Sequence, residues 1–123
     1  MQLNHERPDY AWVLRGADGR RARVNDRVLE RSFALAPDRL IEDWDAPAAA
    51  ALEPGHLEPL LALAPELVVL GTGERQVFPP PAVMAACLTR GIGIEVMDNA
   101  AAARTYNVLA GEGRKVVVAL LLG

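Results

Sequence analysis

Three short and almost entirely apolar runs in the second half of the chain constrain its fold most. They are Glu66–Leu70, Gly93–Met97 and Lys115–Leu122, and helical segments at Pro81–Arg90 and Ala100–Ala110 separate them. A strand that is apolar on both sides must be covered on both faces of its sheet, as in parallel sheets flanked by helices. The alternation therefore predicts an α/β fold whose mixed, mostly parallel central sheet forms the core.

The two predicted helices are bounded by residues that suit helix ends. Pro81 fits a first turn, where its missing N–H needs no partner, and Gly91 is expected to end the first helix in a left-handed conformation. Asp98 or Asn99 can cap the second helix by accepting a first-turn N–H. Gly111 is expected to close that helix.

The first half of the chain predicts an antiparallel hairpin region. Strands are expected at Tyr10–Arg15, at Arg21–Val24 and at Arg31–Pro37, with turns at Gly16–Gly19 and Asn25-Asp26. Pro37 has no N–H to continue a ladder and ends the third strand. Together these segments predict a meander.

A loop is expected to join the two halves. The stretch from residue 38 to 55 has no clean period, and Trp44 is its expected buried anchor. A short helix at Leu57–Leu63 should follow. No linker separates two domains, so residues 1–123 are expected to form one domain with one hydrophobic core.

Composition excludes several classes of function. The net charge of −3 gives no general attraction to nucleic acid or to an anionic membrane. No signal peptide or run long enough to span a membrane is present, and the one cysteine fits a reducing compartment. We expect a soluble, cytoplasmic protein, and the wealth of alanine and arginine over lysine looks bacterial.

Gly71-Thr72-Gly73 follows an apolar strand and resembles the start of a phosphate-binding loop. A dinucleotide fingerprint needs a third glycine where Gln76 stands. A P-loop needs glycine, lysine and serine or threonine where the chain has Gln76, Val77 and Phe78. Both known phosphate loops are excluded.

Two interpretations of this loop remain. It is either a structural turn at the end of a strand, or a site where the N–H groups of Thr72, Gly73 and Glu74 bind a small anion near Arg75. Beyond the loop, Asn107 and Arg114 are polar residues that the predicted core does not explain. The candidate ligand-binding residues are Gly71, Thr72, Gly73, Arg75, Asn107 and Arg114.

Arg114 precedes the last predicted strand, where it is expected to pair with Glu95 or Asp98 or to bind a ligand. Helical spacing places Tyr106 in the core on a stripe with Ala102, and its hydroxyl then needs a partner.

Catalytic and metal-binding residues are scarce. Ser32 is the only serine, and His5 and His56 are the only histidines, so a nucleophilic triad has few possible members. Together with Cys87 the histidines show no metal-ligand spacing, and Cys87 itself is expected to be a small core residue. We expect no catalytic residue, no metal and no cofactor.

The arginines from Arg15 to Arg31 could form a basic strip for RNA. Because no exposed aromatic platforms accompany them, a solvated sheet face is the favoured interpretation.

The chain resembles the Mth938 domain family, also called DUF498. The resemblance rests on "RSFALAP", Trp44, "LVVLGTG" and "GIGIEVMDNAAAARTYNVLAGEGRKVVVALL", and it covers nearly the whole chain. Its most specific elements are Gly71-Thr72-Gly73, Ala103–Asn107 and Gly113-Arg114. It implies a three-layer α/β domain in which an antiparallel hairpin region packs on a mixed sheet.

The resemblance also bears on function. One mitochondrial member of the family is an assembly factor for respiratory complex I, a cytosolic animal member is linked to adipocyte differentiation, and no catalytic residues carry over. We therefore expect a noncatalytic module that binds another protein, with assembly of a respiratory or other membrane complex as the first hypothesis. The alternative is a protein that binds a small anion or nucleotide-like ligand, or an enzyme, using the loop from Gly71 to Arg75.

Overall fold

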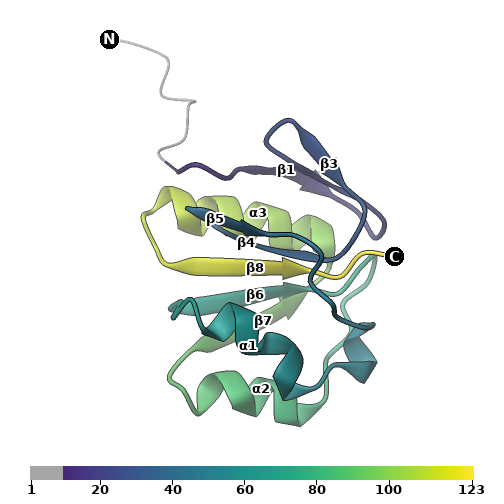
Figure 1. Cartoon of the computed structure of the whole chain (residues 1–123), viewed down its shortest axis with the longest axis vertical. Helices are drawn as coiled ribbons and strands as arrows, with labels where there is room; N and C mark the ends of the chain where they lie inside the picture. The colour runs from purple at the N-terminus through teal and green to yellow at the C-terminus, as the bar shows by residue number, and fades with distance from the viewer. Residues whose placement is uncertain (1–9) are drawn as a thin grey trace.

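A central five-stranded sheet organises the structure, a computed structural model that describes residues 10–123 (Figure 1). The strand order is β5-β4-β8-β6-β7. β6 pairs in parallel with β7 and β8, whereas β4 pairs antiparallel with β8 and β5, which confirms a mixed sheet. The bounds are β4 Phe33–Ala36, β5 Arg39–Ile41, β6 Leu67–Gly71, β7 Gly93–Met97 and β8 Val116–Leu120.

A separate three-stranded antiparallel sheet precedes the central one. Its strands are β1 (Leu14–Ala17), β2 (Ala22–Val24) and β3 (Arg27–Leu29). The prediction of a first strand at 10–15 and a turn at 16–19 was wrong. The turn lies later because the Asp18 carboxylate accepts the backbone N–H groups of Arg20 and Arg21, at 2.8 and 2.9 Å, and so holds the chain reversal there.

The meander prediction was also wrong beyond β2. Sequence analysis did not predict β3, which is the third strand of the first sheet. The strand that was predicted as third, β4, belongs to the central sheet, where it pairs with the middle strand β8. All four residues of β4 are buried, which requires cover on both of its faces. β5 replaces part of the expected loop, because Pro37-Asp38 forms a two-residue turn that returns the chain antiparallel to β4.

The connection to β6 is partly helical. Short 3₁₀ helices η2 (Ala49–Ala51) and η3 (Pro54–Leu57) lead into a single turn of α-helix, α1 (Glu58–Leu61), shorter than predicted. Trp44 is buried, and its indole N–H donates to the carbonyl of His56 at 2.7 Å. This confirms Trp44 as the anchor of the segment.

The two long helices are α2 (Pro81–Leu88) and α3 (Asn99–Gly111). The Asp98 carboxylate caps α3 by accepting the Ala101 N–H at 2.8 Å. Gly91 has a φ of +73°, as predicted, but α3 is closed by Gly113, whose φ is +79°, and not by Gly111. The N–H groups of Gly113 and Arg114 return to the carbonyls of Ala110 and Leu109, which forms a Schellman motif.

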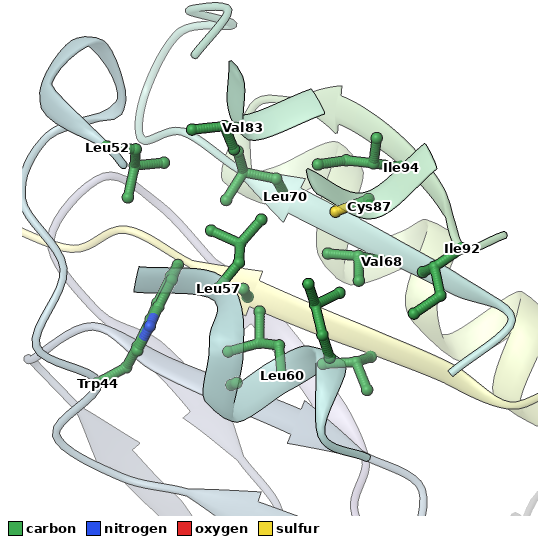
Figure 2. Packing of buried hydrophobic residues seen from close by; sticks show 14 of the residues in the cluster. Trp44, Leu52, Leu57, Leu60, Val68, Leu70, Val83, Cys87, Ile92 and Ile94 are labelled. Carbon is green, nitrogen blue, oxygen red and sulfur yellow. The ribbon is translucent and has the colours of Figure 1, made fainter. Parts of the chain in front are cut away.

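The central sheet buries a different core on each face, so the expectation of one hydrophobic core was wrong. In β6, Val68 and Leu70 face a cluster formed with α1, α2 and Trp44, which Figure 2 shows around Leu57. Val69 faces a second cluster with α3 and the three-stranded sheet. The molecule therefore has three layers, with α1 and α2 on one side of the central sheet and α3 with β1, β2 and β3 on the other (Figure 1). No helix among residues 10–123 combines the length and apolar character needed to cross a membrane.

Two leucines allow a matched test of this core. Leu57 is fully buried and Leu88 is 59% exposed. We predict that Leu57→Ala lowers the free energy of unfolding by about 2 to 5 kcal/mol, because it leaves a cavity. Leu88→Ala should change it by less than about 0.5 kcal/mol. Urea titration followed by circular dichroism measures both, and equal losses would contradict the assigned burial.

Candidate functional site

The Gly71–Gly73 loop begins where β6 is most tightly packed. A side chain at Gly71 would collide with the Asn99 side chain and with the Leu120 side chain. The backbone is held on both sides, because Leu121 donates to the Gly71 carbonyl and Thr72 donates to the Met97 carbonyl, each at 3.0 Å. The first glycine is required by this close approach rather than by a ligand.

The Thr72 hydroxyl closes the rest of the loop. It donates to the Arg75 carbonyl at 2.6 Å and accepts the Val77 N–H at 2.9 Å. One side chain thus satisfies main-chain groups on both sides of the turn. The extended segment that follows is tied to the outer strand by Gln76, whose amide donates to the Val96 carbonyl at 2.8 Å.

Gly73 exchanges hydrogen bonds with Asn99, the first residue of α3. Its N–H donates to the Asn99 side-chain oxygen at 3.0 Å, and its carbonyl accepts the Asn99 N–H at 2.9 Å. Two of the three N–H groups in the predicted anion cradle, those of Thr72 and Gly73, therefore already have protein partners. In this conformation the loop has the bonding of a structural turn.

The Asn99 amide is the centre of this region. Asn99 is fully buried, and its side-chain nitrogen donates to the carbonyls of Asp18 and Leu121, each at 2.9 Å. Sequence analysis treated Asn99 only as a possible helix cap. The structure shows that Asp98 serves as the cap, which leaves the neighbouring Asn99 amide to bond elsewhere, and the sequence carries no signal that chooses between the two.

An open concavity of about 500 Å³ lies beside the loop. Thr72 and Gly73 line it, together with Arg20 and the acidic side chains of Asp18 and Glu74. The Glu74 carboxylate accepts the Gly19 N–H at 2.7 Å, so it is fixed next to the glycines. Carboxylates at this position oppose an anionic ligand.

Asn107 and Tyr106 attach α3 to the first sheet. The Asn107 side chain donates to the Leu14 carbonyl and accepts the Leu14 N–H at 3.2 Å, so it pairs with β1 as a neighbouring strand would. The Tyr106 hydroxyl donates to the Trp12 carbonyl at 2.6 Å, which confirms Tyr106 as a core residue with a partner. Burial raises the pKa of Tyr106, as do the nearby Tyr10 and Asp38 to a smaller extent, so it is a neutral structural donor.

Arg114 lies away from the loop. It pairs with Glu66 at 3.2 Å, so the predicted pairing with Glu95 or Asp98 was wrong. Glu66 precedes β6 and Gly71 ends it, so at roughly 3.3 Å per residue their separation along the strand is about 16 Å. Arg114 instead borders another open concavity of about 580 Å³, and the six candidate residues do not form one site.

The residues considered for catalysis or metal binding are also apart. The hydroxyl of the buried Ser32 accepts the Leu122 N–H, and His56 accepts the Glu53 N–H in a helix cap. Cys87 is fully buried, as expected of a core residue. His5 lies outside the described residues, and within those no group of three or more His, Cys, Asp and Glu side chains could hold a metal.

Comparison with known proteins identifies the family. The family model described as a protein of unknown function, DUF498/DUF598, matches residues 14–121. The chain belongs to this family. A solution structure from Xanthomonas campestris has 58% identity and a TM-score of 0.85, and covers 100% of this chain and 93% of that one. A Bordetella pertussis Mth938-like domain has 31% identity and a TM-score of 0.81, over 98% of this chain and 92% of that one.

One relative with a named role is NADH dehydrogenase [ubiquinone] 1 alpha subcomplex assembly factor 3 of Bos taurus. It is 43% identical over 100 residues, which are 80% of this chain and 54% of that protein. The chain thus spans about half the length of the curated relatives it matches.

Gly71 and Gly16 provide a matched pair for the loop. We predict that Gly71→Ala lowers the free energy of unfolding by about 1 to 3 kcal/mol, because the added methyl group overlaps Asn99 and Leu120. Gly16→Ala should stay within about 0.5 kcal/mol, since nothing lies within 4 Å of its methyl group. Thermal and urea unfolding measure both variants. If Gly71→Ala left the free energy of unfolding unchanged, close packing would not explain why the first residue of the loop is glycine.

Cys87 provides a test by chemical labelling. Burial raises the pKa of its thiol, so fewer molecules carry the reactive thiolate at mildly alkaline pH than for a free cysteine. We predict negligible reaction of the folded protein with a thiol-specific chromogenic reagent and full reaction in denaturant. Rapid labelling of the folded protein would show that α2 does not protect this residue.

Proposed function

We propose that this chain is a noncatalytic module that binds a partner protein during assembly of a multisubunit membrane complex. A respiratory complex is the first candidate. The observation that carries the proposal is the 43% identity to the bovine assembly factor over 80% of this chain. At this identity and coverage, the matched region has the same fold, and a shared mode of protein binding is a reasonable inference.

The arrangement of the polar residues supports a binding role over a chemical one. Asn99, Tyr106 and Asn107 bond to main-chain groups of other layers or loops, and Thr72 bonds to the main chain of its own loop. A general base or nucleophile must instead reach a substrate from a cleft. These side chains therefore act on the chain's own backbone, which supports a role for the surface in recognition.

The ligand-binding alternative stays a prediction. It requires the loop from Gly71 to Arg75 to present free N–H donors, and those of Thr72 and Gly73 have partners. It would also require Asn107 and Arg114 to reach the same ligand, which their positions on separate parts of the fold do not favour.

Affinity capture tests the proposed function. The full chain with a removable tag, used as bait in native lysate and detergent-solubilised membranes of its host, should retain one partner in stoichiometric amount by quantitative mass spectrometry. The tag alone and an unrelated domain of similar size serve as controls. Repeated capture without a stoichiometric partner, or substrate turnover by the purified chain, would contradict a noncatalytic assembly module.

A further inference from the structure

The outer face of the three-stranded sheet is strongly basic. Ala22 and Val24 of β2 point into the core, so Arg23 between them points outward. Opposite Arg23 stand Val28 on β3, which is 52% exposed, and Gly16 on β1, which has no side chain to cover it. We call this surface the arginine face, and it comprises Arg15, Gly16, Arg21, Arg23 and Val28.

The arginines at the rim of this face and those at its centre differ in their partners. At the rim, Arg21 pairs with Glu30 at 3.6 Å. Next to the face, Arg27 pairs with Glu42 at 2.7 Å and Arg31 pairs with Asp43 at 3.6 Å. Among residues 10–123, Arg15 and Arg23 have no carboxylate within ion-pair distance, so within this part of the chain their positive charge is uncompensated.

The charge is concentrated in a short stretch of the chain. Residues 15–31 contain six arginines and three acidic residues, a net charge of +3, whereas the whole chain carries −3. The remaining residues therefore carry −6. Arg27 and Arg31 pair with Glu42 and Asp43, which lie outside this stretch. The attraction for an acidic partner is therefore directed at Arg15 and Arg23, while the acidic remainder of the molecule repels it.

The shape and chemistry of the face favour an acidic protein segment over other anions. The guanidinium group of arginine can donate two parallel hydrogen bonds to one carboxylate, and arginine is enriched at protein interfaces. No aromatic side chain belongs to the face, so nucleic-acid bases would have no stacking surface. Val28 is its one exposed large apolar side chain, too little to insert into a bilayer, but enough for contact with an apolar residue of the partner.

We propose that the arginine face docks an acidic segment of the partner protein, with Arg15 on β1 and Arg23 on β2 binding its carboxylates and Val28 on β3 contacting an apolar side chain that follows them. This inference deepens the proposed function and rests on it for the identity of the partner. The docking chemistry itself can be tested without that partner.

The probe is a short fluorescein-labelled peptide in which a run of glutamates is followed by a single leucine. We expect the full chain to bind it, and the variant R15E/R23E to bind about tenfold more weakly, since two attractive contacts become repulsive. The matched variant R39E/R104E reverses two exposed arginines that also lack ion-pair partners among residues 10–123, one on β5 and one on α3. It should change the affinity less than about twofold, because these arginines lie outside the face. Fluorescence anisotropy at low salt and at about 150 mM salt, where charges are screened beyond about 8 Å, measures all three.

Four results would overturn the proposal. They are absent binding by the wild type, equal losses in the two double variants, undiminished binding of a peptide with glutamines in place of the glutamates, and tighter arginine-dependent binding to phosphatidylglycerol vesicles or single-stranded RNA. Circular dichroism confirms that both variants are folded.

Capture from lysate with R15E/R23E separates this proposal from the proposed function. Loss of the partner by this variant alone supports docking at the face. Equal capture by wild type and variant overturns the arginine face but leaves the assembly function standing. Failure of the wild type to capture any partner, together with arginine-dependent peptide binding, contradicts the assembly function and leaves the docking chemistry standing.

Discussion

The fold depends on one buried amide, that of Asn99. From the start of α3 it bonds to the main chain of three segments: the β1–β2 turn at Asp18, the glycine loop at Gly73 and the stretch after β8 at Leu121. These segments are remote in sequence. The amide oxygen accepts the Gly73 N–H, and the amide nitrogen donates to the carbonyls of Asp18 and Leu121. A buried amide that lost these partners would be strongly destabilising, so the three segments are coupled through a single side chain.

A second set of contacts on α3 attaches the outer layer of the molecule. Tyr106 and Asn107 bond to the main chain at Trp12 and Leu14, and so fix the three-stranded sheet against the helix. Together with Asn99 they give α3 polar contacts at its first residue and beyond its middle, while Ala102, Ala103 and Ala110 lie in the core. The Ala103–Asn107 segment that marks the family resemblance is thus explained by architecture, because a small sheet needs such anchoring to stay in place.

This use of polar residues bears on function. The polar side chains of the glycine loop and of α3 bond to the backbone, so they have a structural role in this conformation. Charge is distributed unevenly along the chain, with +3 in residues 15–31 and −6 in the rest. The proposed docking of an acidic partner rests on this distribution.

The sequence by itself determined the α/β alternation, the strands β6, β7 and β8, the helices α2 and α3, and the burial of Trp44 and Tyr106. All of these follow from local apolar patterns and from helix-end chemistry, which are encoded within a few residues. Only the tertiary structure decided that β4 joins β8 in the central sheet, that Asn99 connects three loops, and that Arg114 pairs with Glu66 far from the glycines. These three contacts depend on which distant segments of the chain meet. A short hydrophobic strand or a single polar side chain does not specify its partner until the layers pack together.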